Sequence, residues 1–313
     1  MWWLRHQWYH KQYTLFLVLL LPLSILFGCI VWLRRFCYRI GFIKSDRAPV
    51  PVIVVGNITV GGSGKTPVII ALCQYLRSMG YRPGVISRGY GGAYTEPTAV
   101  LPISDPLFVG DEPVLIARRA QVPVVVAKRR IDAVYALLAK HDCNLILSDD
   151  GLQHYALQRD MEIAVVKQLG NRFLLPAGPL RESVSRLKTV DIVLYPCLSG
   201  NILVNLADST LRKPVTELAG QCIHAVAGIA DPQGFFAYLE HMGLKVIPHP
   251  FPDHYAFKPK DIEFSDELMV VMTEKDVVKC EAFADKRVWY LPVEVVFDRH
   301  VIEQFSSQLK GVI

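Results

Sequence analysis

The residues whose spacing most directly suggests chemistry lie at 56–66, where glycines lead into a Gly-Lys-Thr triplet. A β-branched apolar run at 52–55 precedes them, and apolar residues at helical spacing follow from Val68. In a strand, glycine turn and helix of this kind, backbone N–H groups face anionic oxygens, Lys65 reaches the terminal phosphates and the Thr66 hydroxyl faces Mg²⁺. The sequence therefore predicts a phosphate-binding loop made of Thr59, Val60, Gly61, Gly62, Ser63, Gly64, Lys65 and Thr66.

This loop departs from the G-x-x-x-x-G-K-[ST] pattern at one position, because Thr59 stands where the first glycine is expected. The alternative is a glycine-rich strand-to-helix turn that carries an incidental lysine. The order of strand, glycines, Gly64-Lys65-Thr66 and helix favours phosphate binding over that alternative.

A second candidate is the acid pair Asp149 and Asp150, which ends an apolar run at 144–148. In enzymes with a phosphate-binding loop, a neighbouring strand brings a carboxylate to Mg²⁺, because this cation prefers oxygen ligands. The sequence leaves open which of the two acids touches the metal, and a surface Asp-Asp-Gly turn is the alternative. Gln153 and His154 follow directly and are expected at the same rim.

Two further residues are candidates for proton transfer. Asp111 is expected at the start of a helix, where an acid ordinarily does no more than complement the helix N-terminus. His254 lies far along the chain, and only an acid beside it would make it a relay.

Arginines in loops marked by glycine or proline are candidates for clamping phosphate. They follow successive predicted strands, at the edge where open α/β sheets bind ligands. The candidates are Arg88, Arg129 or Lys128, and Arg181. Taken singly, each is equally consistent with a solvated surface charge.

The elements that must position these residues alternate between short apolar strands and helices from residue 45 onward, which predicts a parallel sheet covered by helices. The expected strands are 52–56, 83–87, 122–127, 144–148, 162–166 and 190–195, and the expected helices are 65–79, 112–120 and 129–140. A smaller α/β region follows, with strands at 222–229, 268–272 and 289–296 and a helix at 232–241. Gly80 and Gly243 are expected to end the helices before them.

Residues 13–33 carry no charged side chain, and a helix that spans a membrane needs about 20 such residues. Basic residues are more numerous after this segment than before it, so the positive-inside rule places the following chain in the cytoplasm. Those that follow are Arg34, Arg35, Arg39, Lys44 and Arg47. The alternatives are a lipoprotein signal that ends before Cys29 and a buried helix of a soluble protein, and Pro22 leaves open a kinked or partly inserted helix.

Composition narrows the class of protein. A chain of 313 residues that is 51% hydrophobic can build two modest domains. A formal net charge of +5, with no basic run longer than residues 128–130, argues against a nucleic-acid binder. Seven cysteines without a C-x-x-C pair argue against a disulfide framework and a zinc cluster. No obligate protein partner is inferred.

Seven motifs, in order, resemble those of the tetraacyldisaccharide 4'-kinase family, the lipid A 4'-kinases of Gram-negative bacteria. They lie at 56–67, 87–91, 109–113, 149–154, 178–182, 251–254 and 273–276. In this family a threonine replaces the first loop glycine, as Thr59 does here. The resemblance implies an enzyme at the cytoplasmic face of the inner membrane that uses ATP and Mg²⁺. Its reaction would transfer the γ-phosphate to the 4'-hydroxyl of an acylated glucosamine disaccharide 1-phosphate, in lipid A biosynthesis.

The resemblance also implies roles for residues. Lys65 and Thr66 would be the phosphate-loop pair, Thr66, Asp149 and Asp150 would serve Mg²⁺, and Asp111 would be the catalytic base, tuned by His254. The residues expected around nucleotide and acceptor are Arg88, Tyr90, Gln153, His154, Arg181 and Glu182. Three parts would follow one another: a membrane anchor at 1–44, a P-loop kinase domain at 45–215 and an α/β domain at 216–313 that closes the cleft.

The alternative function is a membrane-anchored P-loop ATPase or GTPase of another role. A guanine-binding [NT]-K-x-D motif is not formed, because Asp276 directly follows Lys275. Val60 also stands where the dimeric ATPases of that group often carry a lysine.

Overall fold

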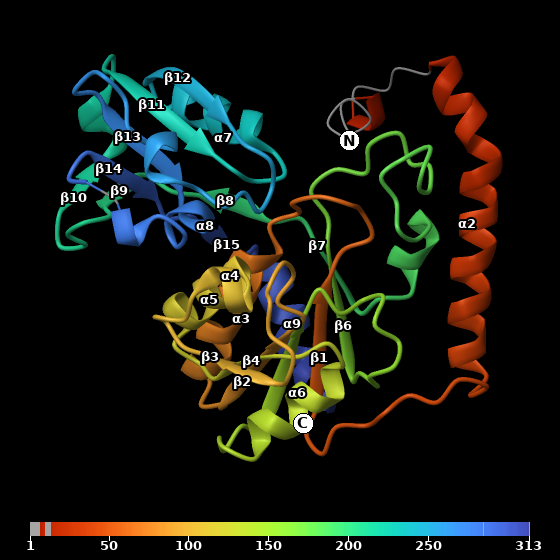
Figure 1. The fold of residues 1–313 in the computed structure, drawn as a ribbon. Coiled ribbons are helices and arrows are strands. Elements are labelled where there is room, and N and C mark those ends of the chain that lie inside the picture. Colours follow the sequence, from red (N-terminus) through yellow and green to blue (C-terminus); the bar gives the residue numbers. More distant parts are fainter. Residues whose placement is uncertain (1–6, 10–13, 284, 313) are drawn as a thin grey trace.

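The computed structural model describes residues 7–9, 14–283 and 285–312, and its first sheet has seven strands in the order β3-β4-β2-β5-β1-β6-β7 (Figure 1). Neighbouring strands are parallel except for β3 and β4. The strands are β1 (Val52–Gly56), β2 (Pro83–Ser87), β3 (Thr98–Val100), β4 (Val124–Val126), β5 (Leu145–Asp149), β6 (Met161–Val165) and β7 (Ile192–Leu194). The predicted P-loop NTPase-like parallel sheet is therefore confirmed.

Helices cover both faces of this sheet, which is why its central strands are apolar along their whole length. Ile53 and Val55 of β1 pack in one core with α3 (Lys65–Ser78) and α5 (Asp111–Ala120). Val52 and Val54 point to the opposite core, which α6 (Arg130–Leu138) covers. A short helix, α4 (Pro106–Val109), leads into α5.

The second sheet has six strands in the order β10-β9-β14-β13-β11-β12. They are β9 (Ile202–Asn205), β10 (Arg212–Pro214), β11 (Cys222–Ala227), β12 (Lys245–Pro250), β13 (Met269–Thr273) and β14 (Val288–Leu291). The helices that accompany it are α7 (Pro232–His241) and α8 (Glu274–Val277). Short 3-10 helices occur at Val184–Lys188, Val215–Leu218, Pro259–Asp261 and Glu281–Phe283.

The chain passes between the two sheets twice. A two-stranded ribbon of β8 (Cys197–Ser199) and β15 (Glu294–Val296) joins the crossing segments. The last helix, α9 (Arg299–Val312), then returns to the first sheet, where Phe305 and Leu309 enter its core. The sheets thus divide between β8 and β9, ahead of the expected boundary at 215 and 216, and the end of the expected 216–313 domain lies against the first sheet.

Most predicted elements are confirmed to within two residues at each end. Gly80 and Gly243 follow α3 and α7 with φ of 87° and 92°, as expected for glycines that end helices. The predicted strand at 289–296 is wrong as one element, because Pro292 and Val293 separate β14 from β15 and proline has no N–H for the ladder. The sequence analysis did not predict β3, β8, β9, β10, β12 or the helices α4, α8 and α9.

The apolar segment near the N-terminus forms one helix, α2 (Leu15–Arg39), six residues longer at its C-terminal end than the predicted 13–33 segment. Tyr13 lies outside the described residues. Figure 1 shows α2 running alongside the first-sheet part of the molecule, separated from it by the loops that follow β6. By length and composition α2 is able to cross a membrane, and only 11% of its most apolar window is buried.

Candidate active site

The phosphate loop connects β1 to α3, as predicted. Gly61 and Gly64 have φ of 113° and 80°, values that residues with a Cβ rarely adopt. A Cβ at Gly56 would lie 2.8 Å from Leu152, so the strand end also requires glycine. Lys65, the first residue of α3, has only 11% of its side chain exposed, and its Nζ lies 3.4 Å from Asp150 Oδ1.

Two distant segments hold the outer side of this loop. The Val60 N–H donates to the Pro179 carbonyl at 2.8 Å, and the Arg181 N–H donates to the Ile58 carbonyl at 2.7 Å. The Tyr9 hydroxyl donates to the Val60 carbonyl at 3.2 Å. The predicted motif at 178–182 therefore lies beside the predicted phosphate loop, and Tyr9 also contacts that loop.

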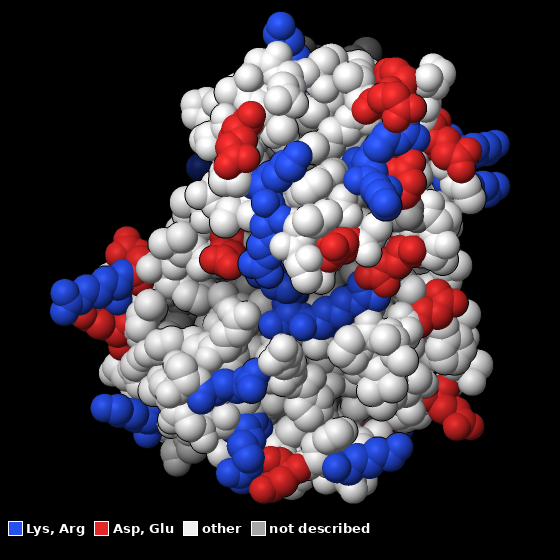
Figure 2. Space-filling model, turned by 90° about the vertical axis from the view of Figure 1, so that its left-hand side faces the viewer, with Lys and Arg blue, Asp and Glu red and all other residues white. Residues whose placement is uncertain are grey.

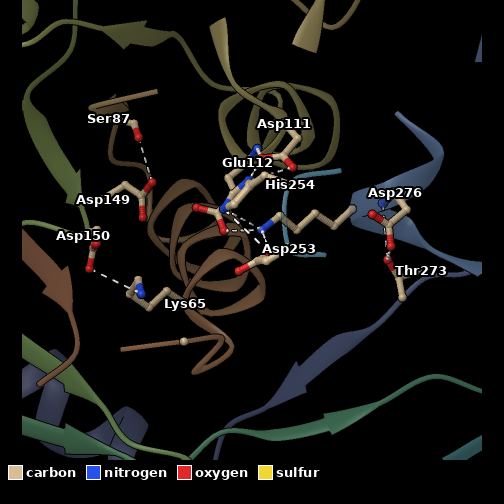
Figure 3. Close-up of polar contacts among 12 residues, drawn as sticks. Lys65, Ser87, Asp111, Glu112, Asp149, Asp150, Asp253, His254, Thr273 and Asp276 are labelled. Atoms are coloured by element: carbon tan, nitrogen blue, oxygen red, sulfur yellow. Dashed lines mark hydrogen bonds and ion pairs between the residues drawn. The ribbon is translucent and has the colours of Figure 1, made fainter. Parts of the chain in front are cut away.

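The acid pair stands at the end of β5, directly beside β1, where Val55 pairs with Asp149. Asp149 is 2% exposed, and its Oδ2 accepts a hydrogen bond of 2.8 Å from Ser87 at the end of β2. Asp150 leaves the strand with φ of 46°, so the two carboxylates have different surroundings (Figure 3). Arg181 Nη1 and Lys65 Nζ flank Asp150, at 3.0 and 3.4 Å.

These surroundings separate the two acids electrostatically. Burial, together with nearby Glu112 and Asp150, raises the pKa of Asp149 to about 7. Burial also acts on Asp150, but the charges of Lys65 and Arg181 outweigh it and lower the pKa of Asp150 to about 2. Asp150 is already paired with two cations, whereas the Asp149 carboxylate forms no ion pair with any residue that the structure describes.

Two buried oxygens, on Asp149 and on Ser63 of the predicted phosphate loop, are of a kind that fits a magnesium ion. Asp149 Oδ1 and Ser63 Oγ are buried and have no hydrogen-bond partner among the residues that the structure describes. No three His, Cys, Asp or Glu side chains form a metal site in the described ranges. A site with so few protein ligands suits Mg²⁺, which keeps several waters and is completed by substrate phosphates.

One arginine near Asp149 was not predicted. Arg130, in the first turn of α6, is 2% exposed and donates from Nη2 to the Asp149 carbonyl at 2.8 Å. Its Nε and Nη1 have no hydrogen-bond partner within the described chain. The sequence analysis named Arg129 or Lys128 instead, which are exposed, and Arg129 lies 3.4 Å from Asp46 at the surface.

The residues that follow the acid pair support the loops around it. Gln153 Nε2 donates to the Asn57 carbonyl at 3.0 Å and to Glu182 Oε1 at 2.7 Å. Tyr155 donates to Glu182 Oε2 at 2.6 Å, so both oxygens of this buried carboxylate already accept hydrogen bonds. Burial and nearby arginines lower the pKa of His154 to about 4, which keeps its ring neutral at pH 7.

Asp111 and His254 meet although 143 residues separate them. His254 Nδ1 lies 3.0 Å from both carboxylate oxygens of Asp111, and Asp111 Oδ1 accepts a hydrogen bond of 2.8 Å from the Glu112 N–H. Asp111 is the first residue of α5, beside the first sheet, whereas His254 follows β12 of the second sheet. Figure 3 shows this pair close to Glu112, between Asp149 on the left and Asp276 on the right of the view.

Charge keeps Asp111 ionised. Burial opposes ionisation, but the hydrogen bond from His254 and the charges of Lys275 and Lys279 outweigh it, so the pKa of Asp111 lies below its usual range. The pKa of His254 is raised, because its bond to Asp111 exceeds the opposing effects of burial and Lys275. The expected pairing of Asp111 with His254 is thus present in the fold.

The remaining predicted residues lie in the loop after β2. A Cβ at Gly89 would lie 2.5 Å from the Val109 carbonyl, so the 87–92 loop packs tightly against the segment that leads to Asp111. The ring of Tyr90 is 5.3 Å from that of His254, and 71% of Tyr90 is exposed. Arg88 is exposed beside it, where a ligand would be accessible.

Comparison with known proteins gives one consistent result. A family model described as Tetraacyldisaccharide-1-P 4'-kinase matches residues 16–310. The chain is 48% identical over 322 residues to the Tetraacyldisaccharide 4'-kinase of Methylobacillus flagellatus, covering 98% of this chain and 96% of that protein. It is 49% identical over 302 residues to the protein of the same name from Nitrosococcus oceani, covering 92% of this chain and 88% of that protein.

A solved structure has the same fold. It is the crystal structure of the "apo" form of LpxK from Aquifex aeolicus in complex with ATP, which is 29% identical in sequence. The superposition has a TM-score of 0.81 and covers 95% of this chain and 99% of that chain.

Proposed function

The chain belongs to the tetraacyldisaccharide-1-P 4'-kinase family, and we propose that it performs the family's reaction where its two sheets meet, with Asp111 as the base. The enzyme is an ATP-dependent kinase of lipid A biosynthesis that phosphorylates the 4'-hydroxyl of tetraacyldisaccharide 1-phosphate. The alternative function, an ATPase or GTPase of another role, is set aside. The observation that supports the site is the Asp111–His254 contact, which joins a helix of the first sheet to a loop of the second.

In the proposed reaction, the sugar 4'-hydroxyl donates a hydrogen bond to Asp111. As the bond between the 4'-oxygen and the γ-phosphorus forms, the bond from that phosphorus to the β-phosphate oxygen breaks, and Asp111 takes the hydroxyl proton. A base whose pKa is low still suffices, because a loose phosphoryl-transfer transition state needs little nucleophile deprotonation. ADP is the leaving group of this same step.

Lys65 and Arg181 stabilise charge on the transferred group. Both now face Asp150, from 3.4 and 3.0 Å, and both carry donors that phosphate oxygens accept. Thr66 and Asp149 would hold Mg²⁺, which when bound neutralises charge on the β- and γ-phosphates. Asp150, which was also expected to serve the metal, would instead orient the lysine and arginine beside it.

We also propose that α2 associates with the cytoplasmic face of the inner membrane. Ser24 is buried, donates to the Leu174 carbonyl and accepts from the Ala177 N–H, each at 2.9 Å. Arg35 donates to Thr189 at 3.0 Å. These contacts hold α2 to the irregular chain at 174–177 and at Thr189. If α2 crossed the membrane upright, it would carry this irregular backbone into the bilayer, where its polar groups would lack water. We therefore place α2 along the membrane surface, with its exposed apolar side inserted.

The substrate supplies a reason for this arrangement. Lifting an acyl chain out of a bilayer costs about 0.8 kcal/mol per CH₂, so a lipid with four chains stays in the membrane and the enzyme must come to it.

The test of the proposed reaction is turnover on vesicles that contain the disaccharide lipid, with ATP and Mg²⁺. We expect ADP release only when the lipid is present, with one phosphate transferred per ADP. ADP release without lipid would contradict the proposal and indicate an ATPase.

The membrane proposal predicts the effect of a triple substitution on the exposed side of α2. Leu19, Ile25 and Trp32 are 68%, 68% and 65% exposed. Because burying one such side chain contributes roughly 1.5–3 kcal/mol, replacing all three by glutamine should lower vesicle affinity about 100-fold or more. A sedimentation assay measures this. A matched control replaces Leu101, Ile103 and Leu107, which are exposed elsewhere, and should bind as the unmodified enzyme does.

A further inference from the structure

The motif at 273–276 has no role in the proposed reaction, yet the structure holds it firmly at the site. Thr273 Oγ1 accepts from the Asp276 N–H, which caps α8, and donates to Asp276 Oδ2 at 2.6 Å. Asp276 is fully buried and accepts from the Gly228 N–H at 2.8 Å. These bonds fix α8 at the end of β13, so the direction of Lys275 is set by the fold.

Lys275 reaches across the junction between the two sheets. Its Nζ lies 3.0 Å from Glu112 Oε1 on α5, 3.2 Å from Asp253 Oδ1 and 3.4 Å from His254 Nε2. Its side chain is 17% exposed, so water screens these contacts little. One ammonium group therefore ties the helix that carries Asp111 to the loop that carries His254.

We propose that Lys275 is a positioning residue that holds His254 in the tautomer with its hydrogen on Nδ1, directed at Asp111. An ammonium group has donors only, and a carboxylate has acceptors only. The ring nitrogen that faces Lys275 must therefore accept, and the one that faces Asp111 must donate. This inference rests on the proposed function for its effect on rate, but not for the tautomer itself.

The groups around His254 make this arrangement sensitive to pH. Asp111 and Asp253 face the ring with negative charge, Lys275 faces it with positive charge, and Tyr90 packs on it at 5.3 Å. Behind them lie Glu112, paired with Lys275, and Lys279, which is 3.5 Å from Asp111 Oδ2. Burial and Lys275 both lower the pKa of His254, against Asp111. Removing Lys275 should therefore raise this pKa and favour the doubly protonated ring.

The test is Lys275→Met. We expect single-turnover rates at saturating ATP to fall about 10-fold to 100-fold, a share of the roughly 10²–10⁴-fold that a general base contributes. The KM for ATP should change less than about twofold, because Lys275 contacts no predicted nucleotide residue. The acid limb of the rate profile should move to higher pH, and Lys275→Arg, which keeps charge and donors, should move it less.

Other ion pairs at the same junction provide the control. Arg118 on α5 donates from Nη2 to Glu281 at 2.9 Å and does not contact His254. Figure 2, which views the left-hand side of the molecule as drawn in Figure 1, shows Lys and Arg side chains across its middle, with Asp and Glu beside them. Arg118→Met removes one such pair, so it should leave the pH profile unchanged. If it shifts the acid limb as Lys275→Met does, the effect comes from loosened packing and the inference is wrong.

A measurement without turnover separates this inference from the proposed function. Nitrogen NMR of ¹⁵N-histidine-labelled enzyme reports which ring nitrogen of His254 carries the hydrogen. At a pH above the titration of His254, we expect a hydrogen on Nδ1 alone in the unmodified enzyme, and loss of that signature in Lys275→Met. An unchanged tautomer in Lys275→Met would overturn the inference. A changed tautomer in an enzyme whose rate does not depend on Asp111 would support the inference while contradicting the proposed function.

Discussion

Replacing Asp111 by asparagine is expected to lower the single-turnover rate about 10²–10⁴-fold, the usual contribution of a general base. The substitution keeps the shape of the side chain and removes the charge that accepts the proton. ATP affinity should change little, because the contacts of Asp111 are with His254, Lys279 and the Glu112 N–H. Rates at saturating ATP and a separate ATP-binding titration measure the two effects.

His254→Ala should cost less than Asp111→Asn, since His254 acts through Asp111 and supplies only a share of the effect. Because the ring lies 3.0 Å from both Asp111 oxygens, the two residues are expected to act as one unit. The double variant should therefore be much less impaired than the product of the two single losses. Losses that multiply fully would show that the residues work independently, and Asp111 would then be an ordinary helix N-terminal acid.

Local pattern was enough to predict where the loop at 59–66 and the acid pair lie in the fold. A buried strand, glycines and a helix follow one another within residues 52–78, so their geometry depends on neighbours in the chain. Asp149 lies beside that loop because parallel strands end at the same edge of a sheet, and β5 pairs directly with β1. These parts of the site follow from the sequence because each depends on one strand or one turn.

Arg130 is a site residue that local sequence pattern did not predict. Lys128, Arg129 and Arg130 are adjacent, and which of them points inward depends on the residue at which α6 begins. The predicted helix started one residue early, at 129, and the predicted candidates, Arg129 or Lys128, are the exposed members of the run. Because a helix turns about 100° per residue, an error of one residue changes which side chain is buried.

The partners of Lys275 lie beyond prediction from pattern for a different reason. Glu112 is 163 residues away, and the two meet only because α5 and α8 pack together after both sheets have formed. Short or proline-containing strands such as β10 and β12 give weak signals, so the second sheet was only partly predicted. Contacts between the two sheets form only when the whole chain is packed, and the periodicity of the sequence does not predict that packing.

Replacing Lys65 by alanine is the second change for which we expect a large effect. Lys65 begins α3 and points its ammonium group to Asp150, where the terminal phosphates of ATP would lie. A lost charge-assisted hydrogen bond costs about 1.5–3 kcal/mol, which corresponds to roughly 10-fold to 150-fold in rate or affinity. We therefore expect kcat/KM for ATP to fall at least about 10-fold. Steady-state kinetics with varied ATP and a fixed amount of lipid measure it.

The fold should survive this substitution. Asp150, the carboxylate that Lys65 contacts, keeps its pair with Arg181 at 3.0 Å, so a thermal melt close to that of the unmodified enzyme is expected. Arg129→Ala is the matched control, because Arg129 pairs with Asp46 and Asp132 at the surface and should leave kcat/KM unchanged. A Lys65→Ala enzyme within about threefold of the unmodified rate would contradict the phosphate-loop role. Arg88, Arg130 and Arg181 would then be the candidates for neutralising the transferred phosphate.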